Sequence, residues 1–119
     1  CVIVRRDNQE KLTIELNKVG NELEYILEDI QKNMYNQCEK IRKDRTNIAL
    51  NMDEFITKLN NNQGYIKTMW CESEECENKI KELTGAHSRC IPFEQENISQ
   101  TCVCCGKEAN KMVVWGRQY

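Results

Sequence analysis

The sequence predicts an α+β fold with a long N-terminal helix, a mixed sheet and a metal site formed by cysteines. Apolar residues recur at steps of three or four from Leu16 to Ile41, which is the spacing of one helical face. Short apolar segments bounded by polar turns follow and predict strands and shorter helices. Among them lie two pairs of closely spaced cysteines, Cys71 with Cys76 and Cys102 with Cys105. We therefore expect one compact body, or a small one with an extension.

The first part of the chain predicts a pair of short strands followed by the long helix. The expected elements are a strand at residues 2–4, a polar turn at 7–10, an extended return at 12–14 and a helix at about 15–45. The helix is acidic in its first half and basic in its second, which complements the helix dipole. Cys1 and Cys38 are expected to be core thiols.

The second part predicts alternating helices and strands around the cysteines. The expected elements are a helix at residues 51–59, a strand at 65–70, a helix at 73–84, a strand at 89–93 and a β-hairpin of 101–103 with 112–115. Gly85 is the expected stop of the 73–84 helix, with Ile80 and Leu83 on its apolar face. This arrangement places Cys71 at the end of a strand and Cys76 on the first turn of a helix.

The two cysteine pairs predict a structural zinc site. Thiolates separated by two to four residues on tight turns hold one ion from two sides, and two pairs complete the tetrahedral shell that zinc prefers. Gly106 follows Cys105 and lets the backbone turn around the ion. Four thiolates leave no position for water, so the pattern predicts a structural centre rather than a catalytic one.

Disulfides are the alternative use of eight cysteines. Most of them lie after residue 70 instead of being spread along the chain, and no secretory signal is recognisable. These observations favour zinc. Cys104 competes with Cys105 as the fourth ligand, and Cys90 and His87 are weaker candidates, each more simply explained as an ordinary strand residue.

Composition and motifs exclude several functions. The charged fraction is 30% and the net charge is −2, which is typical of a cytoplasmic chain and does not predict nucleic-acid binding. No apolar run approaches the length of a membrane span, so no membrane partner is expected. No phosphate-binding glycine loop or catalytic triad is present, and no catalytic residue is assigned. The absence of an initial methionine leads us to expect the tail of a longer polypeptide.

Segments spread over nearly the whole chain carry a resemblance to one family. They are Val4-Arg5-Arg6-Asp7, Ile30-Gln31-Lys32-Asn33-Met34-Tyr35, Trp70-Cys71 with Cys76-Glu77, Arg89-Cys90-Ile91-Pro92-Phe93, Cys105-Gly106-Lys107-Glu108-Ala109 and Trp115-Gly116-Arg117-Gln118-Tyr119. In this order they resemble the carboxy-terminal region of prolyl-tRNA synthetases of the archaeal and eukaryotic type. The ordered cysteine pairs and the final Gly-Arg-x-Tyr are the specific parts.

The resemblance implies a domain of a larger enzyme. It implies that residues 1–15 end an anticodon-binding domain and that 16–119 form a two-layer α/β sandwich with bound zinc. Cys71, Cys76, Cys102 and Cys105 match the family's metal ligands, and Tyr119 matches a terminal tyrosine whose carboxylate reaches toward the active site. The implied parent is a homodimeric ligase that uses ATP and Mg²⁺ to join proline to tRNA(Pro). Its catalytic and anticodon domains would be this domain's partners.

Two other classes of function remain open on the sequence alone. One is a free-standing zinc-knuckle adaptor that binds protein or RNA. The other is a redox thiol protein, for which Cys104 is the candidate reactive thiol.

Overall fold

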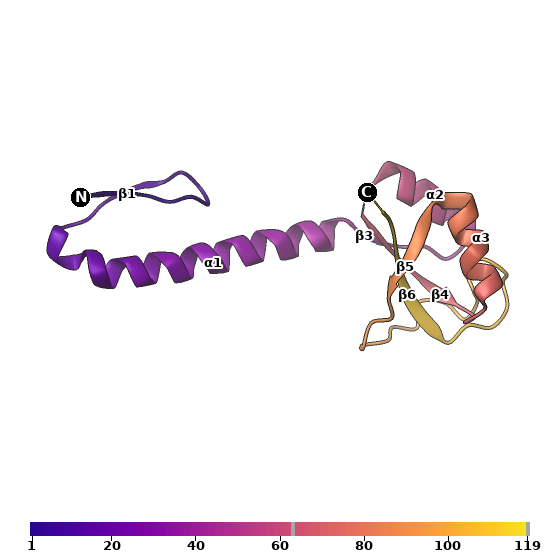
Figure 1. Cartoon of the computed structure of the whole chain (residues 1–119). Helices are drawn as coiled ribbons and strands as arrows, with labels where there is room; N and C mark the ends of the chain where they lie inside the picture. Colours follow the sequence, from indigo (N-terminus) through magenta and orange to yellow (C-terminus); the bar gives the residue numbers. More distant parts are fainter. Residues whose placement is uncertain (63, 119) are drawn as a thin grey trace. The chain divides into compact units, whose positions relative to one another are not determined.

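The computed structural model describes residues 1–62 and 64–118, and the chain forms two compact units, Cys1–Lys43 and Asp44–Tyr119. The α+β prediction is confirmed (Figure 1). The domain boundary expected after residue 15 stays a prediction about the parent protein. None of the helices that the structure describes combines the length and the apolar character that crossing a membrane requires.

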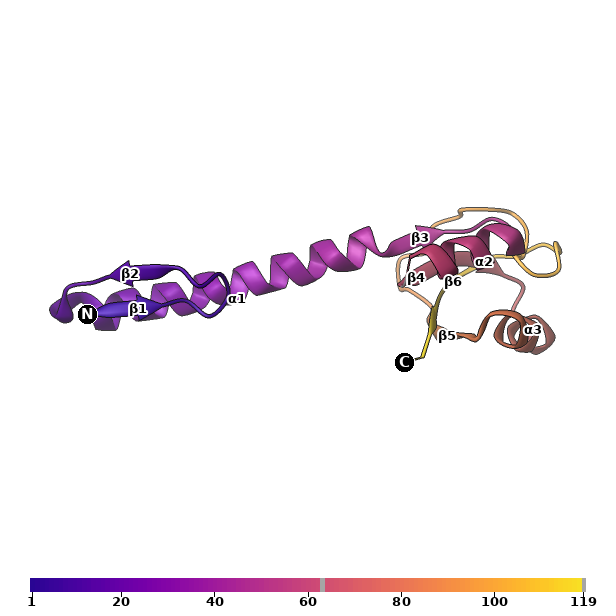
Figure 2. The ribbon, with the colours of Figure 1, turned by 90° about the horizontal axis from the view of Figure 1, so that it is seen from above.

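The first unit is a hairpin packed along a long helix. Strands β1 (Val2–Val4) and β2 (Lys11–Thr13) pair antiparallel. A short 3-10 turn, Leu16–Lys18, leads into helix α1 (Val19–Asp44). Figure 2 shows the hairpin lying along the N-terminal half of α1. These elements fall where the sequence predicted them.

A buried guanidinium fastens the hairpin to α1. Arg5 is 8% exposed and donates two hydrogen bonds to Asp7, at 3.1 and 2.9 Å, and one of 2.7 Å to Asp29 on the helix. Asn33, one turn further along the helix, donates to Asp7 at 2.7 Å. The Arg5 and Asn33 side chains hold the pKa of Asp7 well below its usual range. Arg5, which directly follows β1, is therefore buried because carboxylates in the turn and on α1 neutralise its charge.

The predicted apolar stripe of α1 is buried over only part of its length. Ile26 and Ile30 are buried, whereas Met34 and Ile41 remain exposed. The expectation that Cys1 and Cys38 are core thiols is wrong, because both are exposed. The hairpin lies along only the N-terminal half of α1 (Figure 2), and Ile41, on the other half of the helix, is exposed.

The second unit is a four-stranded mixed sheet with two helices on one face (Figures 1 and 2). Its elements in chain order are β3 (Thr46–Ile48), α2 (Met52–Asn61), β4 (Tyr65–Trp70), α3 (Glu74–Thr84), β5 (Ala86–Cys90) and β6 (Lys111–Arg117). The spatial order is β3-β4-β6-β5, in which β3 runs parallel to β4 and the other neighbours pair antiparallel. This is the expected two-layer α/β sandwich.

The core lies between the sheet and the helices. Trp115 on β6 is fully buried and meets the rings of Phe55 on α2 and Trp70 on β4 edge to face, at centroid distances of 6.4 and 6.5 Å. Its indole N–H donates a buried hydrogen bond of 2.9 Å to Thr68. Ile80 of α3 completes this cluster from the helical side. The aromatic side chains therefore fix the distance between the two layers.

Helix ends follow the predicted signals. The Asn51 side chain accepts a hydrogen bond of 2.9 Å from the backbone of Glu54 and starts α2. Gly85 ends α3 with a left-handed φ of 69°, which glycine adopts without strain. On α3, however, Leu83 is exposed and Thr84 is buried in its place.

The structure differs from the sequence prediction at three places in this unit. Strand β3 was not predicted. The strand expected at 89–93 is β5, shifted to Ala86–Cys90, and Cys90, Ile91 and Phe93 are exposed. The hairpin of 101–103 with 112–115 does not form, because one edge of β6 pairs with β4 and the other is taken by β5 and, at Met112, by the Gln95 side chain. Residues 101–108 instead close a small loop through a single bridge between Thr101 and Glu108.

Candidate metal centre

The first pair of candidate ligands is placed by the junction between β4 and α3. Cys71 directly follows the last residue of β4, and Cys76 lies on the first turn of α3. Between them the carbonyl oxygen of Ser73 accepts hydrogen bonds from the backbone of Cys76 at 3.1 Å and from the indole of Trp70 at 3.2 Å. Glu72 adopts a left-handed φ of 63° in this turn. These contacts fold the chain back so that both sulfurs face the same point.

The second pair is placed by a tight loop before β6. The backbone N–H of Cys102 donates to Lys107 at 2.7 Å, and that of Gly106 donates to Cys102 at 3.0 Å. Gly106 has a φ of 71°, in the left-handed region where glycine is favoured. The backbone N–H of Val103 donates to Met69 of β4 at 3.0 Å and ties the loop to the sheet. The loop is thus a knuckle held against the end of β4.

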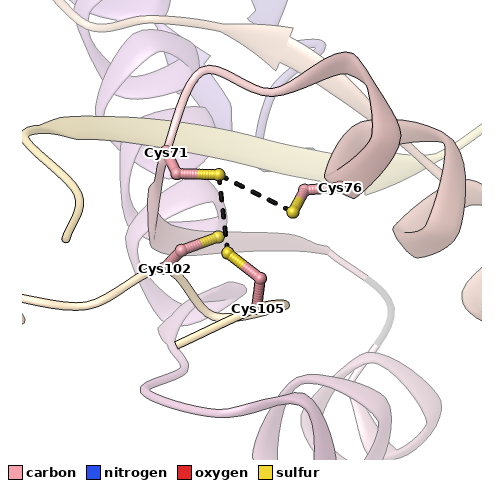
Figure 3. A group of neighbouring side chains, drawn as sticks. All are labelled: Cys71, Cys76, Cys102 and Cys105. Carbon is pink, nitrogen blue, oxygen red and sulfur yellow. Dashed lines mark hydrogen bonds between the residues drawn. The ribbon is translucent and has the colours of Figure 1, made fainter. Parts of the chain in front are cut away.

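The four sulfur atoms converge (Figure 3). All lie within 4.8 Å of one another, and the Sγ of Cys71 is 3.6 Å from both Cys76 Sγ and Cys105 Sγ. A disulfide requires a sulfur separation of about 2.05 Å, and all eight cysteines are free thiols. The structure therefore brings together the four predicted cysteines without linking them covalently.

This geometry fits a tetrahedral metal ion. Two of the six sulfur–sulfur distances are 3.6 Å, and a regular tetrahedron with that edge has its centre about 2.2 Å from each corner, close to the zinc–sulfur distance of about 2.3 Å. A set of four soft thiolates favours zinc over magnesium or calcium, which take oxygen ligands. No second group of three or more clustered metal-ligating side chains occurs in residues 1–62 and 64–118.

The environment of the thiols calls for a compensating cation. Burial raises the pKa of Cys76 and also that of Cys71. A hydrogen bond from the backbone of Lys107 lowers the pKa of the exposed Cys105 to about 7. The knuckle thus favours the thiolate at its open side, while the buried side tolerates thiolates only beside positive charge.

The remaining candidates lie outside the four-sulfur group. Cys104 is half-buried and packs against both apolar clusters of the domain. Cys90 is exposed on β5, and His87 lies half-buried in the same strand opposite Gly116. Tyr119 lies outside the described residues. Sequence reasoning missed the contribution of Glu72, whose positive φ no local pattern announces.

An α/β sandwich closed by four clustered cysteines defines a cysteine-knuckle domain, and comparison with known proteins gives its family. The family model described as "Prolyl-tRNA synthetase, C-terminal" matches residues 52–119. Proteins named proline–tRNA ligase from Clostridium botulinum (strain Okra / Type B1) and Lachnospira eligens are each 48% identical over 119 residues, and one from Ruminiclostridium cellulolyticum is 43% identical. Each alignment covers 100% of this chain and 25% of the relative.

Solved structures agree with this assignment. A crystal structure of the prolyl-tRNA synthetase from Cryptosporidium parvum with L-proline and AMP matches 99% of this chain with a TM-score of 0.89 and 28% identity. A structure of that synthetase with halofuginone and AMPPNP matches with a TM-score of 0.86. Both matches cover 25% of the longer chain. The chain belongs to the prolyl-tRNA synthetase C-terminal domain family, so the resemblance to these synthetases is confirmed.

Proposed function

We propose that this chain is the carboxy-terminal part of an enzyme that uses ATP and Mg²⁺ to join proline to tRNA(Pro). The observation that carries the proposal is the 48% identity over 119 residues to proteins named proline–tRNA ligase. The chain spans only 25% of the length of those relatives. The reaction and its substrates therefore belong to the whole parent, and this chain contributes structure to it.

The role proposed for the cysteines is to hold a structural zinc ion. When bound, zinc supplies a fixed cross-link between the start of α3 and the knuckle, with no position open for a water ligand. The backbone groups of Ser73 and Lys107 position the sulfurs around that point. Such a centre stabilises a domain of this size by an amount comparable to its whole folding free energy, since apparent zinc binding reaches about 10–16 kcal/mol.

Metal analysis combined with a thiol titration tests the zinc proposal. We expect one zinc per chain and four thiols that react only after a chelator removes the metal. A protein that is purified without oxidation of its thiols, contains no zinc and has eight reactive thiols contradicts the zinc proposal.

The proposed role of Tyr119 is to present a carboxylate toward the active site of the parent enzyme. In the full-length synthetase, additional residues after Tyr119 would displace this group, and we expect proline-dependent ATP–pyrophosphate exchange to fall. Zinc content and melting temperature serve as controls that the domain remains folded. Unchanged exchange in a folded extended variant would refute this role.

The parent's activity has its own direct test. Proline-dependent ATP–pyrophosphate exchange, followed by aminoacylation of tRNA(Pro), is expected from the full-length protein that carries this chain, and no exchange with any amino acid would reject the proposal. The parent is further proposed to be a cytoplasmic homodimer. Cell fractionation tests its location, and sedimentation velocity tests its oligomeric state.

A further inference from the structure

One aromatic side chain of the second unit has no cover. Phe93 has a relative exposure of 108%, and Ile91, two residues earlier, is 51% exposed. They flank Pro92 in the turn that leaves β5, and Figure 1 shows this segment turning away from the sheet on the side opposite α3. Among the large apolar side chains that the structure describes, Phe93 is the most exposed, and Ile91 beside it enlarges the apolar area at this turn.

The turn that carries Phe93 is fixed rather than loose. The side-chain amide of Gln95 donates to the carbonyl of Pro92 at 2.6 Å, and its oxygen accepts from the backbone N–H of Met112 at 2.7 Å. The same amide nitrogen lies 3.4 Å from the carbonyl oxygen of Met112. Gln95 therefore occupies the edge of β6 where β5 has already ended, since the last pair of these strands is Cys90 with Val114.

A second contact fixes the segment that follows. Glu96 forms an ion pair of 3.1 Å with Lys67 on β4. Proline restricts the backbone in the middle of the Ile91–Phe93 turn. An apolar group presented on a pre-ordered turn loses little conformational entropy on binding, so more of its contact free energy appears as affinity.

We infer that the Ile91–Phe93 turn is an anchor that inserts Phe93 into an apolar pocket on the remaining part of the same synthetase polypeptide. This inference rests on the proposed function. The alignment with this chain covers 25% of the relatives and of the solved structures, so those proteins are about four times as long as the aligned part. That additional polypeptide is the occupant, and the exposed Arg89 and Glu94 beside the turn suit the polar rim of such a contact.

The small size of the anchor favours a partner in the same chain. A stable interface between separate proteins buries about 1,200–2,000 Å², far more than one turn with a single aromatic residue supplies. Within one polypeptide the two surfaces are held at a high effective concentration, so a small contact suffices. A second copy of the chain would need a broader apolar surface around Phe93.

The test uses the full-length synthetase that contains this chain. Hydroxyl-radical footprinting should show Phe93 protected relative to the urea-unfolded protein, to the same extent at low and high protein concentration. Phe93→Ala should increase hydrogen exchange of the amides at 90–97 by about 30-fold or more, the expected cost of losing a central aromatic anchor. Phe93→Leu should retain most of the protection.

Leu83→Ala is the matched control, because Leu83 is an exposed apolar residue of the same domain at 58% exposure and is not on the turn. It should leave exchange at 90–97 unchanged. An unprotected Phe93, or protection that appears only as the protein self-associates, overturns the inference. Proline-dependent ATP–pyrophosphate exchange, measured on the same preparation, separates failure of the anchor from failure of the proposed function. An enzyme that is active but has an unprotected Phe93 rejects the anchor alone.

Discussion

The adjacent thiols Cys104 and Cys105 offer a sharp test of the metal centre. Cys105 belongs to the four-sulfur group, whereas Cys104 is half-buried and packs against the apolar clusters. Replacing either residue with alanine removes one sulfur atom and nothing else. The two variants therefore differ in whether the lost sulfur is a ligand, and they decide between the two fourth ligands that the sequence left open.

The expected magnitudes differ clearly. Apparent zinc binding of about 10–16 kcal/mol, divided over four ligands, assigns each thiolate about 3 kcal/mol, or roughly a 100-fold change in affinity. For a unit of this size 1 kcal/mol corresponds to about 4–8 °C, so Cys105→Ala should lower the melting temperature by more than about 10 °C. Cys104→Ala loses only packing, at a cost of about 1 kcal/mol.

The assay is zinc content by elemental analysis after dialysis against a competing chelator, together with thermal unfolding. Cys104→Ala should retain one zinc per chain, and Cys105→Ala should lose it at a chelator concentration that the unchanged protein withstands. Loss of zinc from Cys104→Ala with retention in Cys105→Ala would show that the knuckle uses the other thiol and that the geometric assignment is wrong.

Three further outcomes test other parts of the structure. Gly85→Ala, at a φ of 69°, should lower the free energy of unfolding in urea by about 1–2 kcal/mol. Gly20→Ala in α1 should be neutral or stabilising by up to about 1 kcal/mol. Equal effects of the two substitutions would contradict the helix assignments. Trp115→Phe should destabilise the domain by about 2–4 kcal/mol, because it shrinks the buried core and leaves the Thr68 hydroxyl without its donor. A change in the free energy of unfolding below about 1 kcal/mol, measured by calorimetry, would exclude this role of Trp115 in the core. The folded pKa of Asp7 is depressed by Arg5, so its contribution is present above about pH 4 and is lost as the pH falls through the lower folded pKa; NMR of the hairpin should show this acid transition, and Asp7→Asn should abolish it.

Local signals predicted the elements whose ends are set by nearby residues. The β4 strand at Tyr65–Trp70, the cap at Asn51 and the stop at Gly85 all follow from side chains within one turn of the element. The cysteine pairs were also readable, because two short spacings on turns restrict where the sulfurs can point. Zinc itself stays a prediction for metal analysis to decide.

The expectations that failed depend on contacts between distant residues. Residues 101–103 and 112–115 have the composition of a hairpin, but one edge of β6 pairs with β4 and the other is taken by β5 and Gln95. The sequence predicts a strand at 89–93, yet the strand ends at Cys90 and Phe93 is fully exposed. Burial of an apolar side chain depends on what covers it, and the sequence of this segment does not contain that information.

The position of β6 in the sheet affects how the domain assembles. In the sheet β4 and β5 are each hydrogen-bonded to β6 and not to each other, and β6 follows both of them in the sequence. A growing or truncated chain that stops before Lys111 leaves two unpaired strand edges and an unfilled space where Trp115 belongs. Unpaired strand edges are prone to self-association during synthesis. The domain therefore completes its sheet only when the late strand β6 pairs between β4 and β5.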